Sequence, residues 1–461
     1  MTTRKEADAL GEIEVPEQAL WGAQTQRALQ NFKIGTQTFP PEFIEQYAIL
    51  KKAAALTNLE LGKLSAELSG FIVDACDEVI AGLHRDQFPI SIWQTGSGTQ
   101  TNMNLNEVIA NRANELAGHD RGSRTPVHPN DHVNLSQSSN DTFPTAMHLT
   151  VMQGLLQCLA PALDGLLQAL QQKQRQFEQR IKSGRTHMMD ATPVTLGQEF
   201  GAYYSQIEFA REQLTAVQPA LQCLAIGGSA VGTGLNTHAR WSDAVVQKIS
   251  NLTGIAYRPA DNKFMFMAAH DALLDCHGRL RLLATSLYKM ASDLRLMGSG
   301  PRCGLAEIKL PANEPGSSIM PGKVNPTQIE ALTMVCLRVM ANDSAVAMAN
   351  TQGQFELNVY KPLILHTLWE SITLLADGIN SFNCNCLMGI VANEQQLDEY
   401  MAQSLMLVTA LTPHIGYDNA ALAAKWAYEN NASLKHAVTT LGFLNAADYD
   451  KLVIPVNMLS P

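Results

Sequence analysis

The sequence is poor in aromatic and charged residues and has no excess of positive charge. Aromatic residues make up 6% of the 461 positions and charged residues 16%, whereas 46% are hydrophobic and mostly aliphatic. A composition rich in alanine, leucine and methionine favours helices over strands. The net charge of −10 provides no general attraction for nucleic acid or an anionic membrane, so we expect neither as a partner. An anionic ligand would have to be bound by local cations and helix N-termini.

The sequence also lacks the spacings and runs that mark several other protein classes. Its eight cysteines include no CxxC pair, which argues against a zinc or redox site and favours free thiols in a reducing compartment. Residues 1–8 contain no apolar stretch of the kind found in a secretory signal. No apolar run of about 18 residues is present, so we predict no membrane span and a cytoplasmic location.

The sequence does contain a series of long helical patterns. Apolar residues recur at helical spacing over residues 152–170, 195–224, 267–296, 327–349 and 362–390. We therefore predict a mainly α fold whose centre is a bundle of long antiparallel helices. These apolar stripes are too many for one small bundle to bury, so we expect other subunits to bury some of them.

Changes in the pattern along the chain suggest three domains. Residues 1–144 form a mixed, mostly helical N-terminal domain, residues 145–394 form the central long-helix bundle, and residues 395–461 form a small C-terminal helical domain. Within the last of these, Thr412–Asp418 is predicted to be a loop.

One segment, Gly316–Pro326, combines several groups suited to an oxyanion. Two glycines and two prolines make it an ordered loop, because glycine permits unusual backbone angles and proline fixes them. The loop presents the hydroxyls of Ser317 and Ser318, the ammonium of Lys323 and the amide of Asn325. Such donors bind anion oxygens, and the cation supplies charge.

Two further segments are rich in hydroxyl and amide groups. Thr95–Asn104 alternates glycine with serine and threonine and leads into a helical pattern over residues 104–116, an arrangement that suits an anion at a helix N-terminus. His128–Asn134 and Ser136–Asp141 follow. Their His-x-x-Asp-His spacing suits no common zinc helix. For both segments, plain turns and helix caps remain an alternative.

A fourth segment, Ser183–Pro193, carries Thr186 and His187 between two long helical patterns. An isolated histidine in such a place is usually an ordinary hydrogen-bonded residue. Here Thr186 is an adjacent donor and Glu330 is a possible carboxylate partner, which would fix the histidine tautomer and raise its pKa.

Together, these four segments resemble the fumarase/aspartase superfamily, and the chain is most similar to class II fumarase. The discriminating run is Gly322–Gln328 followed by Glu330, since aspartases usually have alanine at the position of Gly322. The segments Trp21–Arg27, Val231–Asn236 and Gly300–Gly304 support the same resemblance. It implies a three-domain fold that assembles into a homotetramer with a helical core and shares each active site among three subunits.

The resemblance also implies roles for individual residues in the hydration of fumarate to (S)-malate, without a metal or other cofactor. Ser317 would act as the base, with His187 on the opposite side of the substrate and Glu330 behind it. The substrate carboxylates would be bound by Ser97, Thr99, Ser138, Ser139, Asn140, Thr186, Ser318, Lys323 and Asn325. A secondary dicarboxylate site would comprise His128, Pro129, Asn130 and Asp131.

Thr125 and Leu135 stand where relatives often have basic residues, so we expect weak binding at this secondary site. Two alternatives remain for the chain as a whole: an aspartate ammonia-lyase and an inactive scaffold of the superfamily. The joint presence of Ser317, His187 and Lys323 argues against the scaffold.

Overall fold

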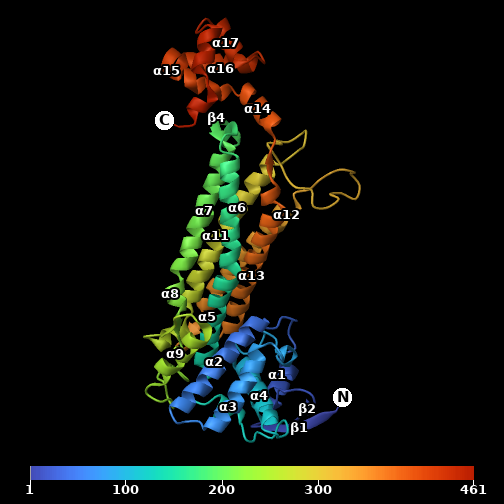
Figure 1. Cartoon of the computed structure of the whole chain (residues 1–461), viewed down its shortest axis with the longest axis vertical. Helices are drawn as coiled ribbons and strands as arrows, with labels where there is room; N and C mark the ends of the chain where they lie inside the picture. The colour runs from blue at the N-terminus through green and yellow to red at the C-terminus, as the bar shows by residue number, and fades with distance from the viewer. Residues whose placement is uncertain (1, 461) are drawn as a thin grey trace. The chain divides into compact units, whose positions relative to one another are not determined.

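The computed structural model describes residues 2–460, and most of them are helical (Figure 1). The longer helices are α2 (Pro41–Glu60), α3 (Ala66–Ile80), α4 (Thr99–Leu116), α5 (Ser139–Gln153), α6 (Ala160–Gln176), α7 (Leu196–Ala216), α9 (Trp241–Thr253), α11 (Asp271–Met297), α12 (Thr327–Asn350), α13 (Lys361–Asn385), α14 (Glu394–Gln403) and α16 (Tyr417–Glu429). The shorter helices are α1 (Ala23–Asn31), α8 (Gln218–Leu221), α10 (Lys263–Ala268), α15 (Thr412–Ile415), α17 (Leu434–Thr440) and α18 (Ala446–Leu452). The prediction of a mainly α protein is confirmed.

Short two-stranded sheets punctuate the helices. The antiparallel pairs are β1 (Thr3–Asp8) with β2 (Gly11–Pro16), β3 (Ile181–Thr186) with β4 (Met189–Thr195), β7 (Ile308–Lys309) with β10 (Val391–Ala392), and β8 (Gly353–Gln354) with β9 (Leu357–Asn358). The remaining pair, β5 (Cys223–Leu224) and β6 (Arg258–Pro259), is parallel. Short 3-10 helices cover Arg85–Gln87, Leu387–Gly389, Leu405–Leu411 and Pro455–Met458, and π-helical turns cover Pro129–Val133 and Gly154–Leu159.

The chain forms two compact units. Unit 1 comprises residues 1–160, 212–282 and 338–374, and unit 2 comprises residues 161–211, 283–337 and 375–461. The division falls after the first residue of α6 and within α7, α11, α12 and α13, so that each of these helices contributes residues to both units. The domain boundaries expected from the sequence stay predictions.

In unit 1, α2 is the central helix and packs against α3, α5 and α9. An aromatic cluster fills the space beside it, with ring centroids 4.7 to 6.1 Å apart among Phe39, Phe43, Tyr47 and Phe143. All four rings are buried, and tilted or edge-on pairs of this kind add to the stabilisation from burial. This core fixes the start of α5, where several candidate site residues lie.

In unit 2, the small C-terminal helices have an apolar core of their own, drawn in orange and red in Figure 1. It includes Leu411, Ala423 and Val438, which have no exposed surface. The predicted loop at Thr412–Asp418 is wrong, because α15 and α16 occupy nearly all of it with only Gly416 between them. Pro413 lies in the first turn of α15, where its missing N–H costs no hydrogen bond.

Two other helix boundaries differ from the prediction. Helix α4 begins at Thr99, so Thr99 itself lies in its first turn. The pattern expected over 195–224 is divided into α7 and α8, since a new helix begins at Gln218 with Pro219 in its first turn. Thr99 therefore lies at a helix N-terminus rather than in a free loop.

Two helical segments are long and apolar enough to cross a membrane by length and composition, namely Ser139–Gln176 and Thr327–Asn350. The sequence analysis looked for an uninterrupted apolar run and did not find these segments, because serine, threonine and glutamine stand among their apolar residues. The first window is 67% buried within the chain, as expected of a core helix, whereas the second is only 33% buried. Burial therefore accounts for the first helix, and the exposed apolar face of α12 requires another explanation.

Candidate functional site

In unit 1, three hydroxyls from two separate segments form a chain of hydrogen bonds. The Oγ of Ser97 lies 2.8 Å from Thr99 Oγ1, which lies 2.7 Å from Ser139 Oγ. Ser97 is buried, and Ser139 is the first residue of α5. The segments that the sequence analysis singled out around residues 97 and 139 are thus brought together at the N-termini of α4 and α5.

The start of α5 is held by a capping box. Ser138 Oγ accepts from the backbone N–H of Asn140, and Asp141 Oδ1 accepts from the backbone N–H of Ser138. The other carboxylate oxygen of Asp141 accepts from the N–H groups of Gly227 and Ser229 at 3.0 and 2.8 Å. Burial raises the pKa of Asp141 to about 6 despite these donors. The carboxylate thereby joins α5 to the segment around residue 228.

Glycine is required at two positions next to Ser97. A side chain at Gly96 would begin 1.1 Å from the carbonyl oxygen of Val359. Gly98 has φ +78°, and a Cβ there would lie 2.1 Å from the ring of Phe143. The glycines that suggested an anion-binding turn therefore permit close packing of this turn on its neighbours.

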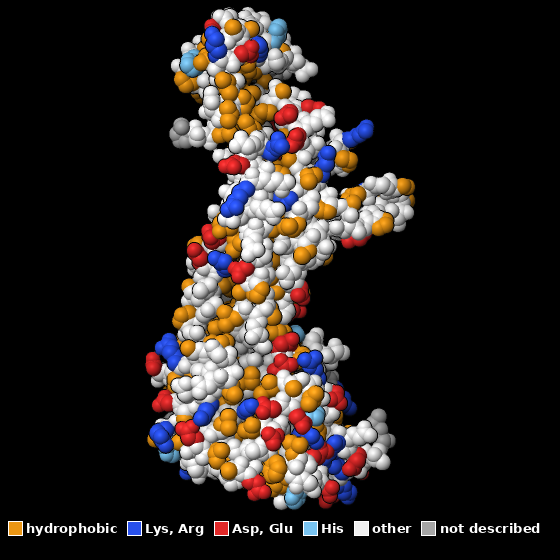
Figure 2. All heavy atoms as spheres, in the orientation of Figure 1, with side chains coloured by type: hydrophobic (Ala, Val, Ile, Leu, Met, Phe, Trp, Pro, Cys, Tyr) orange, Lys and Arg blue, Asp and Glu red, His pale blue; other side chains and the backbone are white. Residues whose placement is uncertain are grey.

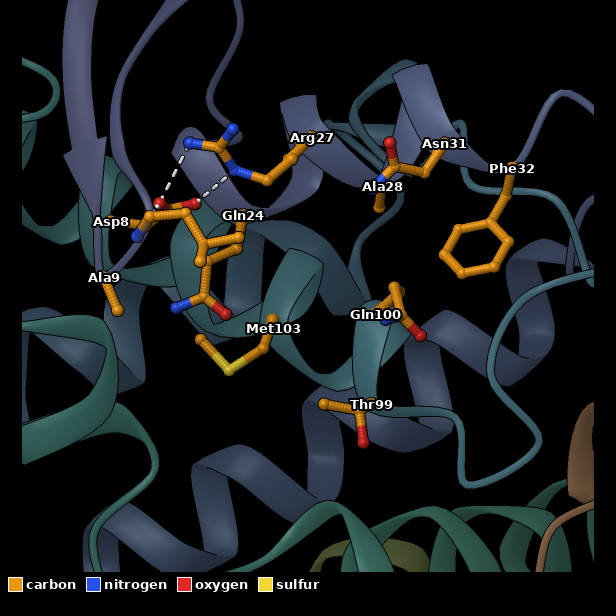
Figure 3. Close-up of a pocket in the computed structure, with 11 residues that line it drawn as sticks. Asp8, Ala9, Gln24, Arg27, Ala28, Asn31, Phe32, Thr99, Gln100 and Met103 are labelled. Carbon is orange, nitrogen blue, oxygen red and sulfur yellow. Dashed lines mark hydrogen bonds and ion pairs between the residues drawn. The ribbon is translucent and has the colours of Figure 1, made fainter.

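A pocket of about 330 Å³ lies beside Thr99 (Figure 3). Thr99, Gln100 and Met103 line one wall, and the Arg27–Asp8 ion pair lines another. Both guanidinium contacts to Asp8 are short, at 2.9 and 3.0 Å, and the side-chain hydrogen bond from Arg27 lowers the pKa of Asp8. Because its cation is already neutralised, this pocket is poorly suited to a dianion.

The candidate secondary segment folds into the π-helical turn Pro129–Val133. His128 caps it, since its Nδ1 accepts from the N–H groups of Asn130 and Asp131 at 3.2 and 3.1 Å. The structure thus places His128, Pro129, Asn130 and Asp131 in one turn, and one ring nitrogen of His128 is engaged within that turn.

In unit 2, Thr186 and His187 lie at the tip of the β3–β4 hairpin. The register pairs Thr186 with Met189, so His187 and Met188 form a two-residue turn with φ values of 55° and 64°. Positive φ at two non-glycine residues is unfavourable and persists only where the surroundings enforce it. Thr186 and His187 are exposed in the single chain, at the point where the hairpin projects.

Charged side chains support the base of this hairpin. Glu307 has no exposed surface; its Oε1 accepts from Arg185 at 2.8 Å, and its Oε2 lies 2.9 Å from Lys182 Nζ. Lys182 is also buried and donates to both oxygens of Glu199, at 2.9 and 3.0 Å. Burial raises the pKa of Glu199, while Lys182 lowers it. We call Lys182, Arg185, Glu199 and Glu307 the hairpin ion cluster.

The segment Gly316–Pro326 is a loop, as predicted, and it belongs to unit 2. Ser317 Oγ accepts from the N–H groups of Ile319 and Met320 at 3.3 and 3.0 Å. These donors stabilise negative charge on that oxygen. Lys323 and Asn325 line a pocket of about 310 Å³ that Lys309 also lines. Within residues 2–460, the ammonium of Lys323 has no hydrogen-bonding partner.

Glu330 lies in the first turn of α12 and forms an ion pair with Arg295 at 3.3 Å. No hydrogen bond joins Glu330 to His187 among the residues that the structure describes. The pairing of these two side chains stays a prediction.

Comparisons with known proteins cover most of the chain. Residues 11–341 match a lyase family, and residues 407–460 match the family described as the fumarase C C-terminus. The class II fumarate hydratase of Thermosynechococcus vestitus is 57% identical over 451 residues, covering 98% of this chain and 97% of the relative. That of Helicobacter pylori is 51% identical over the full length of both chains. The chain belongs to the class II fumarate hydratase family.

The fold comparison agrees. A crystal structure of recombinant class II fumarase from Schistosoma mansoni superposes with a TM-score of 0.97 at 45% identity, covering 99% of each chain. Both the family resemblance and the helix-bundle fold expected from the sequence are confirmed. The roles assigned to individual residues of the site stay predictions.

The sequence analysis missed the charged groups beneath the site residues. Lys182 and Glu307 are buried and contact elements far away in the sequence, so local spacing does not reveal them. Asp141 ends one of the selected segments, but its contacts to Gly227 and Ser229 are equally distant. The only indication of these charged groups in the sequence was Arg185, which stands directly before Thr186.

Proposed function

We propose that this protein catalyses the reversible hydration of fumarate to (S)-malate. The observation that carries the proposal is 57% identity over 98% of the chain with a relative named fumarate hydratase class II. The donor-rich clusters in both units support it, because a dicarboxylate requires many hydrogen-bond donors and local positive charge. None of the eight cysteines forms a disulfide, which is compatible with a cytoplasmic location, and that location is part of the proposal.

In the malate-to-fumarate direction, Ser317 takes the proton from C3. The electron pair left on C3 spreads into the adjacent carboxylate, which gains negative charge as an aci-form. The two N–H groups that donate to Ser317 Oγ favour a deprotonated serine, which is the state a base requires. Lys323 and Asn325 then stabilise the aci-carboxylate more than they stabilise the ground state.

The second step breaks the bond between C2 and the hydroxyl oxygen. The electron pair on C3 forms the double bond, and the hydroxyl leaves as water with a proton supplied from the side of His187. Ser97, Thr99, Ser138, Ser139, Asn140, Thr186 and Ser318 hold the carboxylates during both steps. No metal is needed in this scheme, since donors and Lys323 supply the electrostatic stabilisation.

We further propose that the protein is a homotetramer and that each site is shared among subunits. Helix α12 supports this proposal, because Met334, Leu337 and Met348 are 66%, 54% and 64% exposed on a helix with a mean hydropathy of 1.3 in its most apolar window. Hydrophobic side chains are visible across the surface of the single chain (Figure 2). Such a face is unfavourable in water and is well suited to packing against other copies of α12.

The activity can be tested by ultraviolet absorbance. Adding malate to the purified protein in the presence of a chelator should produce fumarate absorbance, and adding aspartate should produce none. Absorbance with aspartate alone would support the ammonia-lyase, and no turnover of any of these compounds would support the inactive scaffold.

A variant tests the site assignment. His187→Asn should lower kcat by about 10²-fold or more, since placed proton-transfer groups typically contribute 10²–10⁴-fold, while the assembly mass stays that of the wild type. Turnover equal to the wild type would reject the role of His187.

Assembly can be tested by light scattering. The wild type should have about four times the 50.2 kDa chain mass, and Met334→Glu combined with Leu337→Glu should reduce it. Leu422→Glu on α16, where the leucine is 49% exposed, is the matched control and should leave the mass unchanged. A monomeric wild type would refute the shared-site proposal.

A further inference from the structure

Beneath the two hydroxyl segments of unit 1 lies a lysine that the proposed mechanism does not use. Lys51 projects from the middle of α2 and has no exposed surface. Its Nζ donates to Asn102 Oδ1 at 2.8 Å, Gln137 Oε1 at 3.0 Å and Asn134 Oδ1 at 3.2 Å. All three hydrogen-bond acceptors are neutral amides.

A buried ammonium bound only to neutral groups lowers the stability of a protein core, because its loss of hydration is not offset by an opposite charge. An apolar side chain of similar shape would avoid the desolvation cost. The groups that face Lys51 from neighbouring elements are Asp141 of α5, the Cys76 thiol of α3 and the Tyr47 ring, whose centroid lies 5.5 Å away. Burial lowers the pKa of Lys51 to about 7, and Asp141 and Cys76 oppose this.

The ammonium sets the direction of a chain of amide hydrogen bonds. Because it can only donate, each of the three amides must present its oxygen to it. Asn102 therefore turns its Nδ2 toward Asn134 Oδ1 at 3.2 Å, and Asn134 turns its Nδ2 toward the carbonyl oxygen of Gln137 at 3.2 Å. Gln137 donates through Nε2 to the carbonyls of Val133 and Leu135.

This chain ends at the residues that carry the candidate substrate donors. Gln137 directly precedes Ser138, the N-cap of α5, and Asn102 lies one turn after Thr99 on α4. The intervening segment also needs support, because Ser136 has φ 66°. Asn58 of α2 provides part of it by donating to the carbonyl of Leu135 at 3.0 Å.

We propose that Lys51 is a positioning residue for the dicarboxylate site: its ammonium orders the amides of Asn102, Asn134 and Gln137, and so fixes Thr99 and Ser138–Asn140 relative to one another. The inference rests on the proposed function. Lys51 has no contact with substrate in this scheme and acts through the hydroxyl and amide groups above it. Loosening those groups should weaken substrate binding more than the proton transfers assigned to Ser317 and His187.

The first test replaces the charge and keeps the shape. Lys51→Met should raise the KM for malate about tenfold and change kcat by less than about threefold. Lys173→Met is the matched control, because Lys173 is 4% exposed and its Nζ binds the Ile390 carbonyl and Gln176, far from these amides in the hydrogen-bond network. It should lower Tm and leave KM within twofold of the wild type.

The pH dependence distinguishes charge from packing. The ratio of KM for Lys51→Met to KM for the wild type should be largest at pH 6, where Lys51 is protonated, and should fall toward pH 8.5. A ratio that does not change with pH would assign the effect to packing and overturn the proposal.

A second variant keeps the proposal testable if Lys51→Met does not fold. Asn102→Asp gives the ammonium a carboxylate partner, so Tm should be at or above the wild-type value. It also removes the donor to Asn134, so KM should rise about fivefold. An unchanged KM in a folded Asn102→Asp protein would refute the positioning role. Absence of turnover in the wild type would instead refute the proposed function.

Discussion

The hairpin ion cluster provides the sharpest stability prediction. Glu307→Gln keeps the size of the side chain and removes its charge, leaving Arg185 without a carboxylate and Lys182 with Glu199 alone. Removing one partner of a buried pair costs about 3–5 kcal/mol when the other charge is left uncompensated. Here Lys182 keeps a partner and Arg185 is 16% exposed, so we expect a loss at the low end, about 3 kcal/mol.

The assay is urea unfolding at one fixed protein concentration, because the stability of an oligomer depends on concentration. The midpoint should fall with no change in slope, as expected when stability changes and compactness does not. Glu429→Gln is the matched control: Glu429 is 57% exposed, lies 3.8 Å from Lys425, and should cost less than about 1 kcal/mol.

The same variant should disturb the turn that carries His187. We expect kcat to fall, since β3 carries Arg185 two residues before the histidine. Equal unfolding midpoints for Glu307→Gln and Glu429→Gln would refute the reasoning, because the cluster would then contribute no more than an exposed ion pair.

Three further predictions concern other parts of the chain. Gly98→Ala should destabilise the protein by about 2–4 kcal/mol through backbone strain and overpacking, whereas Gly442→Ala, with φ +73° and open space around it, should cost about 1 kcal/mol; equal losses in thermal unfolding would contradict this. The Arg112 hydrogen bond lowers the pKa of Glu78 to about 2, so Glu78 contributes stability above pH 4.5 that is lost as the pH falls toward 2, and Glu78→Gln should flatten this part of the acid-unfolding curve; an unchanged slope would argue against it. Crystals soaked with dicarboxylate near physiological concentration should show none bound at His128, and clear density there would contradict the weak secondary site.

Helices with a regular apolar repeat could be predicted from the sequence. The stripes over 327–349 and 362–390 correspond to α12 and α13, because a 3.6-residue period reports burial on one face. Boundaries at proline were harder, since Pro413 and Pro219 each lie in the first turn of a short helix. The first replaces a predicted loop, and the second divides the helix expected over 195–224. The β3–β4 hairpin was not expected, because its turn residues His187 and Met188 lack the usual Asn-Gly signal.

The candidate site was predictable only in part. Hydroxyl, amide and glycine groups concentrated in short segments marked Ser97, Thr99 and Ser139, and the structure brings these three together. Lys51 and Glu307 could not be found in this way. Neither lies in a segment rich in hydroxyl, amide or glycine groups, and the partners of each are 51 or more residues away.

The loop from Gly316 to Pro326 closes on itself at its base. A side chain on Gly316 would begin 1.7 Å from the carbonyl oxygen of Lys323, and the Asn325 amide donates to the carbonyl of Gly316. The two ends of the loop are therefore held together by contacts within the loop itself. The separation between Ser317 and Lys323 is then set when the single chain folds. Assembly with other subunits would bring this preformed group of donors to the substrate and would not be needed to form it.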